Sequence, residues 1–266
     1  MWDFTVIIAE ELIELLTKRN DMTRYEWLRW LSFPLMTVHL QTVRRDINTL
    51  VGERSKTSPF LSILDVGGRK SPYTIGVSAK ITLLDVPQED GTRKELNLGF
   101  TENILKNIQK NRSNIEDLII QDMTKSTLRD ASFDAVACVE VIEHVEEDEK
   151  FVENISKVIK KGGWAYFTTP NGDFIKNEGP GKNKDHVRHY TRAGLKSLME
   201  RHFETVEVHY AVKTGKYRVM GLKGMSWRKP LLALKTVYGN MVNKIQSKGL
   251  HTSAEGTAHL VAIGYR

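Results

Sequence analysis

Short apolar runs recur along this chain, and polar or glycine positions separate them. Four of the runs contain mostly aliphatic residues and span only four to seven positions, at residues 62–66, 81–84, 117–121 and 133–139. Runs of this length, bounded by turn-forming residues, are typical of buried strands. The chain after residue 58 therefore predicts an α/β pattern of strands with helices and loops between them.

The second half of the chain continues this alternation. A helix is expected at residues 148–160, with Gly162 and Gly163 as its C-cap. The remaining expected elements are a strand, a helix capped by Thr191, and two final strands, at residues 164–169, 191–202, 204–210 and 258–265.

Glycine and acidic residues stand at the ends of the first two runs. The run that contains Asp65 is followed by Gly67 and Gly68, and glycine lets the backbone pass close to a ligand. The next run ends in Asp85, twenty residues after Asp65. A nucleotide-binding unit places an acidic residue there to accept hydrogen bonds from ribose hydroxyls. The spacing predicts one mononucleotide-binding half.

The glycine pattern is shorter than the one that dinucleotide-dependent oxidoreductases use. Those enzymes need G-x-G-x-x-G to hold a pyrophosphate, and here Arg69 and Lys70 directly follow the two glycines. Ser71-Pro72 predicts a short helix that starts almost at once. Hydride transfer is therefore not the expected reaction.

The string CVEVIEH at residues 138–144 closely resembles the C-M-E-M-L-E-H segment of ubiquinone-pathway O-methyltransferases. Over about residues 59–210 and the last strand, the chain resembles class I S-adenosylmethionine-dependent methyltransferases of type 11, although the family's usual third glycine is missing after Gly68. The resemblance implies a Rossmann-like, seven-stranded mixed sheet flanked by helices, with the last strand antiparallel between strands five and six. It implies S-adenosylmethionine as cofactor, S-adenosylhomocysteine as product, and a cofactor site made of Asp65, Gly67, Gly68, Asp85, Val86, Asp122 and Met123.

Glu140, Glu143 and His144 form an E-x-x-E-H cluster after the fourth expected strand, and we expect them to be catalytic. In the ubiquinone-pathway enzymes that the cluster resembles, the matching residues are associated with a divalent cation, which lowers the pKa of a bound hydroxyl. Without a metal, His144 would act as a general base with Glu143 orienting it. A third interpretation is that the histidine only anchors the turn. We assign no residue as a metal ligand.

A second polar cluster follows the fifth expected strand. Residues 185–191 resemble the family's H-x-R-x-Y/F-T segment, and loops at this edge of α/β sheets build substrate sites. His186, Arg188, His189 and Tyr190 are therefore the candidate acceptor-binding residues. The alternative is that His186 and Arg188 lock the loop onto the sheet.

Residues 1–58 are expected to form an N-terminal helical extension of a methyltransferase domain at residues 59–266. Apolar positions recur at helical spacing between Phe4 and Leu16, and Thr23 with Glu26 has the form of a capping box that opens a second, aromatic helix. Three roles are open for the extension. It is a lid over the cofactor, a cover for one side of the sheet, or a dimer contact.

An insert at residues 211–257 precedes the last expected strand. It contains nine basic residues and one acidic residue, Glu255, and so carries a net charge of +8, whereas the whole chain carries +6. Apolar residues at 231–242 interleave with Lys235 and Lys244 as an amphipathic helix that suits an anionic membrane surface. The insert could also hold an anionic acceptor or a nucleic acid backbone, or be a helix packed on the domain with its lysines in water. Nucleic acid is the least expected of these partners.

The rest of the composition fits an intracellular enzyme. The chain has 266 residues, 40% of them hydrophobic, and one cysteine, Cys138, so no disulfide forms within it. No secretory signal or membrane-spanning run is evident. We expect a cytoplasmic location, at most peripheral to the inner face of a membrane. The expected reaction is O-methylation of a small molecule, lipid precursor or sugar. The alternatives are N- or C-methylation, and a non-catalytic cofactor-binding scaffold or regulatory subunit.

Overall fold

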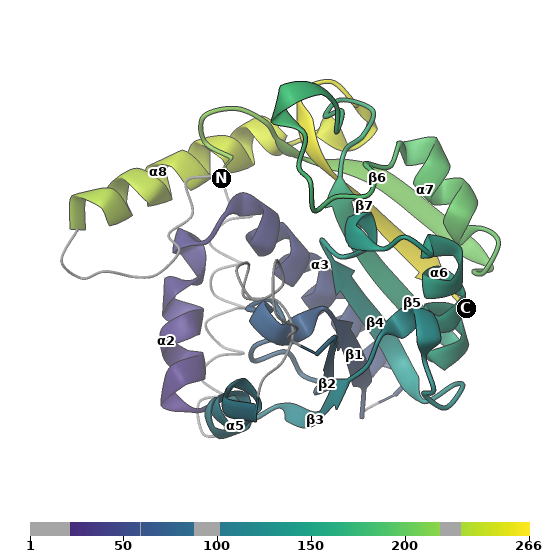
Figure 1. The fold of residues 1–266 in the computed structure, drawn as a ribbon. Coiled ribbons are helices and arrows are strands. Elements are labelled where there is room, and N and C mark those ends of the chain that lie inside the picture. The colour runs from purple at the N-terminus through teal and green to yellow at the C-terminus, as the bar shows by residue number, and fades with distance from the viewer. Residues whose placement is uncertain (1–21, 59, 88–101, 219–229) are drawn as a thin grey trace.

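The computed structural model describes residues 22–58, 60–87, 102–218 and 230–266, and its centre is one seven-stranded sheet (Figure 1). The strand order is β3-β2-β1-β4-β5-β7-β6. Strand β7 runs antiparallel to both of its neighbours, and the other pairs are parallel. The expected mixed sheet with its last strand antiparallel is confirmed. The strands are β1 (Ser62–Val66), β2 (Lys80–Asp85), β3 (Ile115–Ile120), β4 (Phe133–Val139), β5 (Ile159–Pro170), β6 (Thr205–Lys213) and β7 (Thr257–Tyr265).

The central strands end at one level. Val66 at the end of β1 is in register with Leu84 of β2 and with Cys138 of β4. The residues that follow these three strands therefore meet at a single edge of the sheet, which is where ligands bind in open α/β folds. All of the side chains of β4 from Phe133 to Cys138 are buried, which agrees with the continuous apolar run in the sequence.

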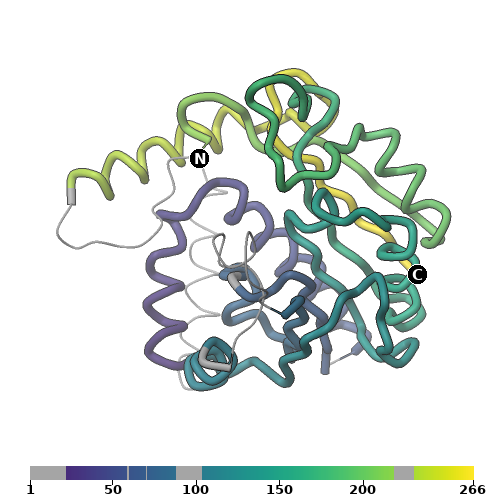
Figure 2. The backbone as a smooth tube through the Cα atoms, viewed as in Figure 1, coloured from purple at the N-terminus to yellow at the C-terminus, as the bar shows by residue number. Residues whose placement is uncertain are grey.

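Helices cover both faces of the sheet and one of its ends (Figure 2). Apolar residues of α6 and α7 pack on one face, and those of α3 pack on the other. Helix α3 thus covers one side of the sheet, as one of the three roles considered for the N-terminal extension requires. The helices are α2 (Arg24–Ser32), α3 (Val38–Ser55), α5 (Glu102–Asn111), α6 (Asp148–Val158), α7 (Arg192–Met199) and α8 (Pro230–Ser247).

Helix α2 begins as the sequence predicts. The backbone N–H of Thr23 donates to the Glu26 carboxylate at 2.8 Å, and the backbone N–H of Glu26 donates to the Thr23 hydroxyl at 3.2 Å. Both halves of the capping box are present. The apolar positions between Phe4 and Leu16 lie outside the residues that the structure describes.

The connection between β1 and β2 contains no α-helix. A single 3-10 turn at Gly68–Lys70 is followed by bends and turns, so the helix expected from Ser71-Pro72 is wrong. The physical reason is that Ser71 does not cap a helix. Its hydroxyl donates to the buried Asp65 carboxylate at 2.5 Å, which ties the loop back to β1.

The end of α6 also differs from its prediction. The helix stops at Val158, and β5 begins at the next residue, so Gly162 and Gly163 belong to the strand and are not a helix C-cap. The pairing of β4 with β5 is irregular here, since Phe133 opposes Ile159 and Ala135 opposes Trp164. The irregular pairing is a bulge, and it needs glycine because Gly162 has a φ of 72°, in the left-handed region.

The packing of α3 makes a prediction about stability. Ile47 is fully buried between α3 and the sheet, so Ile47→Ala should lower the free energy of unfolding by about 2–5 kcal/mol. The exposed neighbour Asn48 gives a matched control, and Asn48→Ala should change it by less than about 0.5 kcal/mol. Urea denaturation measures both. Equal, small effects would mean that α3 is a separable attachment and not part of the core.

Candidate active site

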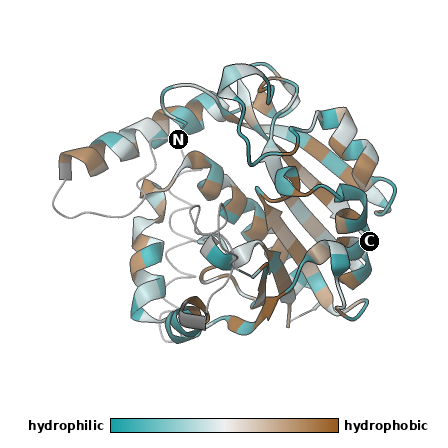
Figure 3. Cartoon of the chain, in the orientation of Figure 1, coloured by the Kyte–Doolittle hydropathy of each residue, from teal (hydrophilic) through white to brown (hydrophobic). Residues whose placement is uncertain are grey.

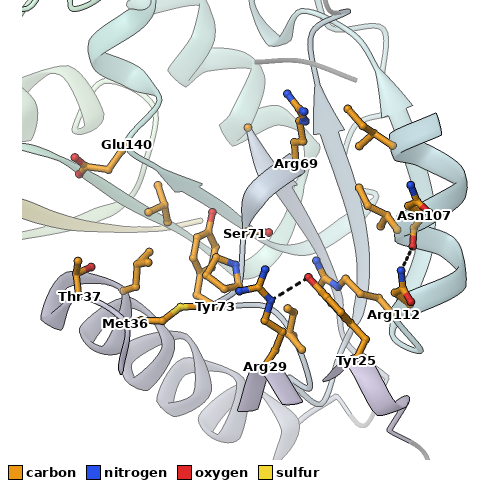
Figure 4. A pocket seen from close by; sticks show the side chains of 18 of the residues that line it. Tyr25, Arg29, Met36, Thr37, Arg69, Ser71, Tyr73, Asn107, Arg112 and Glu140 are labelled. Atoms are coloured by element: carbon orange, nitrogen blue, oxygen red, sulfur yellow. Dashed lines mark hydrogen bonds between the residues drawn. The ribbon is translucent and has the colours of Figure 1, made fainter. Parts of the chain in front are cut away.

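Two adjoining cavities open at the carboxyl ends of the central strands. The smaller, of about 630 Å³, is bordered by the ends of β2, β3 and β4. The larger, of about 910 Å³, lies between this edge and helices α2, α3 and α5 (Figure 4). Gly67, Val139 and Glu140 line both cavities, so these three residues form the boundary between them.

Residues predicted to bind the cofactor surround the smaller cavity. Asp85, Val86, Asp122 and Met123 all line it. The Asp85 carboxylate accepts a hydrogen bond from the Val86 N–H at 2.8 Å, which holds the carboxylate against the backbone at the strand end. Asp122 caps the next turn by accepting from the Thr124 N–H at 2.9 Å. The two carboxylates therefore stand on adjacent strand ends, as the sequence predicts.

Gly67 needs its lack of a side chain. Its φ is 71°, and a Cβ atom there would lie 2.5 Å from the Cγ2 atom of Val141. Its N–H donates to the carbonyl of Leu84 at 2.8 Å, which keeps the backbone at the boundary of the two cavities. Gly68 is equally tight, since its Cβ would lie 2.8 Å from the carboxyl carbon of Asp65.

Asp65 lies behind the cavity wall. It is fully buried, is not among the residues that line either cavity, and accepts hydrogen bonds from the hydroxyls of Ser71, Tyr73 and Thr74 at 2.5, 3.1 and 2.9 Å. Burial raises the pKa of Asp65, while these donors and the charge of Arg112 oppose that rise. In this structure, Asp65 fixes the loop that forms the cavity wall.

Glu140 projects from the end of β4 with a strained backbone, at a φ of 54°. Its carboxylate lies 3.1 Å from Nδ1 of His259 and 3.7 Å from Nε2 of His39, and it accepts from the Thr168 hydroxyl at 3.0 Å. Burial alone would raise the pKa of Glu140, but His259 and then His39 hold it far below its usual range. Burial lowers the pKa of His39 to about 3. The Glu140 carboxylate is therefore occupied by partners from α3 and β7.

Glu143 and His144 occupy the 3-10 turn Ile142–His144 and point to different surroundings. Glu143 is buried, with the Thr169 hydroxyl beside it, and by distance and angle neither of its carboxyl oxygens makes a regular hydrogen bond within the described part of the chain. Burial, and then the charge of Glu140, raise the pKa of Glu143 well above its usual range. His144 lines the smaller cavity, and its Nδ1 lies 2.7 Å from the carbonyl oxygen of Asp185. Because a carbonyl oxygen only accepts, Nδ1 carries the proton, and Nε2 of the neutral ring keeps its lone pair.

The predicted acceptor-binding residues divide into two pairs. Arg188 and Tyr190 both bind the carboxylate of Asp148 at the start of α6, and the Tyr190 hydroxyl donates to it at 2.7 Å. This arrangement is the loop-locking alternative for Arg188. His186 and His189 contact each other, with Nδ1 of His186 2.8 Å from Nε2 of His189, and His186 packs edge-on against His144. His186 is thus the member of the four that stands beside the candidate catalytic turn.

Sequence reasoning missed His39 and His259. They lie on α3 and β7, and their rings stack 3.9 Å apart beside Glu140. Neither stands in a motif, and they are 220 positions apart, so only the three-dimensional fold brings them together. The larger cavity also draws on residues outside the predicted site, and Tyr25, Arg29, Arg69 and Arg112 line it (Figure 4). The aromatic and basic character of the second helix was the available signal.

Comparison with known proteins supports the same family. Residues 78–167 match a family model described as a methyltransferase domain. A mitochondrial ubiquinone biosynthesis O-methyltransferase of Dictyostelium discoideum is 29% identical over 119 residues, which cover 43% of this chain and 37% of that protein. A ubiquinone biosynthesis O-methyltransferase of Coxiella burnetii is 28% identical over 122 residues, which cover 42% and 44%. Residues 78–167 therefore resemble the class I S-adenosylmethionine-dependent methyltransferases, as the sequence motifs indicate. It spans less than half the length of the curated relatives it matches.

Solved structures show the same fold. A structure of an S-adenosylmethionine-dependent methyltransferase from Archaeoglobus fulgidus aligns over 95% of this chain and 99% of its own, with a TM-score of 0.53 and 12% identity. S-adenosylmethionine is the cofactor of such methyltransferases, and two features of the smaller cavity agree with it. The wall at Gly67 has no room for a Cβ, and the carboxylate of Asp85 stands at the second strand end.

The residues that the resemblance implies for a divalent cation do not fit as one set. Among the described residues, ligand atoms within 4.8 Å of one another group Glu140 with His39 and His259. Glu143 and His144 fall in a separate group with His186. The E-x-x-E-H cluster of the methyltransferase domain is therefore divided between two places.

The geometry of the smaller cavity makes a prediction about cofactor affinity. Asp85→Asn should weaken binding of S-adenosylhomocysteine by about 1.5–3 kcal/mol, or more than about tenfold in Kd, because a charged acceptor is lost. Asp117 is a matched control, since its carboxylate also accepts the N–H of the next residue at 2.8 Å but does not line the cavity. Asp117→Asn should leave the Kd unchanged in calorimetric titration. Unchanged affinity in Asp85→Asn would refute the ribose assignment.

Proposed function

We propose that this chain transfers a methyl group from S-adenosylmethionine to an oxygen atom of a small acceptor. The observation that carries the proposal is the pair of cavities that meet at Gly67, Val139 and Glu140. Methyl transfer requires donor and acceptor to be held next to each other in the right orientation, and two adjoining cavities with a shared boundary would place them side by side. The cofactor would occupy the smaller cavity, and the acceptor would occupy the larger one with its reacting group extended across the shared boundary toward His144 on the wall of the smaller cavity.

The chain's own residues would hold both molecules. When bound, S-adenosylmethionine supplies an electrophilic methyl group. Asp85 would accept hydrogen bonds from the ribose hydroxyls of the cofactor, and the backbone at Gly67 would lie against the amino acid portion of the cofactor. His144 stands on the wall of the smaller cavity and directs its Nδ1–H to the carbonyl oxygen of Asp185, so in the neutral ring Nε2 is the nitrogen that carries the lone pair. We assign to this nitrogen the activation of the acceptor hydroxyl.

The larger cavity favours an amphiphilic acceptor. Its walls combine apolar side chains, among them Met36 and Ile108, with three arginines, Arg29, Arg69 and Arg112. Apolar surface suits a ring or chain, and arginine suits a carboxylate or phosphate. The curated relatives are named as O-methyltransferases of ubiquinone biosynthesis, which supports a ring hydroxyl as the methylated group.

Measurements of turnover distinguish two other functions, N- or C-methylation and a non-catalytic scaffold, from O-methylation. N- or C-methylation would use the same cavities, so an acceptor screen that covers hydroxyl, amine and carbon acceptors distinguishes them. A non-catalytic scaffold would bind the cofactor without turnover on any of them. His144, which lines the cofactor cavity with a lone pair free for proton transfer, favours catalysis over the scaffold.

The methyltransferase would meet its acceptor at an anionic membrane surface through α8. This helix is tethered to the domain by its polar side, since Asn240 donates to the carbonyls of Pro34 and Met36 at 2.9 and 2.7 Å, and Asn243 donates to that of Lys213 at 2.9 Å. Its apolar side faces solvent, with Leu234, Tyr238 and Met241 each more than 60% exposed. Figure 3 shows hydrophobic and hydrophilic positions interleaved along the ribbon of α8.

The charge around the exposed face of α8 favours an anionic partner. The apolar stripe of α8 belongs to the insert at 211–257, whose net charge is +8, and an apolar stripe flanked by basic residues suits an anionic lipid interface. No helix among the described residues is long and apolar enough to cross a bilayer. The contact would therefore be peripheral.

The role of His144 makes a prediction about turnover. His144→Ala should lower kcat by about 10²–10⁴-fold and leave S-adenosylhomocysteine affinity nearly intact, because the lost nitrogen acts on the acceptor. The control is His202→Ala, which removes a histidine paired with Glu149 at 2.6 Å, remote from the cavities, and should leave kcat unchanged. Loss of folding in His144→Ala, seen by circular dichroism, would instead support the turn-anchoring interpretation.

The surface of α8 makes a prediction about vesicles. Replacing Leu234, Tyr238 and Met241 together by Ser should abolish sedimentation with anionic vesicles, because the apolar contact is lost. Replacing exposed Lys235 by Glu should weaken sedimentation with anionic vesicles by a smaller amount. This weakening should be larger at low salt, where charges are less screened. Zwitterionic vesicles are the lipid control. If the wild-type chain sediments with neither vesicle, or forms a dimer that the triple variant lacks, the membrane role is refuted.

A further inference from the structure

We propose that Tyr25, Arg29 and Arg112 form a binding subsite for an oxyanion, a carboxylate or a phosphate, at one end of the larger cavity. All three residues line this cavity. Figure 4 shows their side chains on the opposite side of the cavity from Glu140, which stands at the boundary with the cofactor cavity. The inference rests on the proposed function and deepens it, because it states which group the acceptor carries and where that group binds.

The two arginines come from different helices and meet at Tyr25. Arg29 lies on α2, one turn after Tyr25, and its Nε donates to the Tyr25 hydroxyl at 3.2 Å. Its guanidinium carbon lies 5.5 Å from the centroid of the Tyr25 ring. Arg112 directly follows α5, and Figure 4 shows its side chain pointing toward the same hydroxyl. Because the hydroxyl oxygen accepts from Arg29, its own proton is available to an anion.

The described hydrogen bonds of the two arginines all go to neutral groups. Arg112 donates to the Thr74 hydroxyl at 3.0 Å and to the side-chain oxygen of Asn114 at 3.4 Å. Arg29 donates to the hydroxyl of Tyr25. A guanidinium group has five N–H donors in a planar fork that matches the oxygens of a carboxylate or a phosphate. An oxyanion between the two arginines would supply the negative charge that these neutral partners lack.

Arg112 has fewer hydrogen-bond acceptors than a buried cation requires. It is 7% exposed, and burial lowers its pKa, although the charges of Asp65 and Glu26 oppose that change. Both of its described hydrogen bonds use Nη2, and its Nε is buried without a partner among the described residues. A buried charged group with unsatisfied donors is unfavourable. Because Arg112 lines the cavity, Nη1 is the donor that a bound oxyanion would meet.

The two carboxylates whose charges act on Arg112 have other partners. Glu26 accepts hydrogen bonds within its own capping box and from the N–H and hydroxyl of Ser113, at 2.8 to 3.0 Å. Asp65 accepts from three hydroxyls of the loop after β1. Neither is among the residues that line the larger cavity, where three arginines stand against a single described carboxylate, that of Glu140. The charges on the cavity wall therefore favour an anion.

Arg69 is not part of the subsite, because it stands on the cofactor side of the cavity. It lies in the 3-10 turn after β1, and Figure 4 shows it apart from Arg29 and Arg112. Burial lowers the pKa of Arg69, and the charge of Asp85 opposes that change. The subsite would therefore hold the end of the acceptor that does not react. The inferred acceptor is a hydroxyl compound with a carboxylate or phosphate at the end opposite to the methylated hydroxyl.

The test measures binding of two small anions to the full chain, with and without S-adenosylhomocysteine and with no turnover. In calorimetric titration, phenyl phosphate or benzoate should bind at one site, and phenol should bind much more weakly because it lacks the charge. The tighter of the two anions identifies the charged group of the acceptor. Arg29→Gln and Arg112→Gln should each weaken its binding more than about tenfold, because each removes a charge-assisted hydrogen bond. Tyr25→Phe should weaken it as well.

Arg24→Gln is the matched control. Arg24 also lies on α2, but it is exposed and is not among the residues that line the cavity, so this variant should leave the Kd of the anion unchanged. Circular dichroism checks the folding of each variant, and Arg29→Gln alone decides the test if Arg112→Gln misfolds.

Three results would overturn the proposal. The first is that neither anion binds the wild-type chain, and the second is a loss in Arg24→Gln as large as that in Arg29→Gln. The third is that S-adenosylhomocysteine displaces the anion, which would assign the arginines to the carboxylate of the cofactor. Cofactor affinity is measured separately in the same titrations. Failure of the subsite therefore leaves the methyl-transfer proposal standing, and failure of cofactor binding would refute methyl transfer without deciding the subsite.

Discussion

The buried carboxylate of Asp65 is the constraint on which the site depends. It sits in β1, an inner strand of the sheet, with no exposure to solvent, and a buried carboxylate without donors is strongly unfavourable. Three hydroxyls of the loop that follows, those of Ser71, Tyr73 and Thr74, donate to this carboxylate, and the nearby charge of Arg112 also stabilises it. The loop is therefore held against β1. This places Gly67 at the boundary between the two cavities. It also keeps the residues between β1 and β2 from forming an α-helix.

The strands and the edge that carries the site could be predicted because they depend on local sequence. The apolar run of β2 ends in Asp85, and that of β4 is followed by Glu140. Parallel register brings these two strand ends to the same edge of the sheet. Two local patterns misled for a physical reason. Gly162 and Gly163 have the composition of a helix C-cap but serve a bulge, and Ser71-Pro72 has the composition of a helix start but satisfies Asp65. In both cases a tertiary contact outweighed local propensity.

The direction of side chains around the candidate catalytic turn could not be predicted. The E-x-x-E-H spacing places three ligand types close in sequence, but the positive φ of Glu140 turns its carboxylate toward α3 and β7. That backbone state is stabilised by His259 and Thr168, which are distant in sequence from Glu140. The separation of Glu140 from Glu143 is thus a property of the whole fold and not of the motif.

The two sides of the site rest on different parts of the chain. The family match at residues 78–167 contains Asp85, Asp122 and His144, so it covers much of the wall of the cofactor cavity. The α2 and α3 walls of the acceptor cavity precede the match, and His186 and α8 follow it. Similarity over the matched segment therefore supports the donor more strongly than the acceptor. The acceptor's surroundings are built from elements for which this chain's own structure is the better guide, and these elements combine three arginines in the cavity with an apolar helix face turned outward. Both features suit a molecule with an anionic group and a long apolar part.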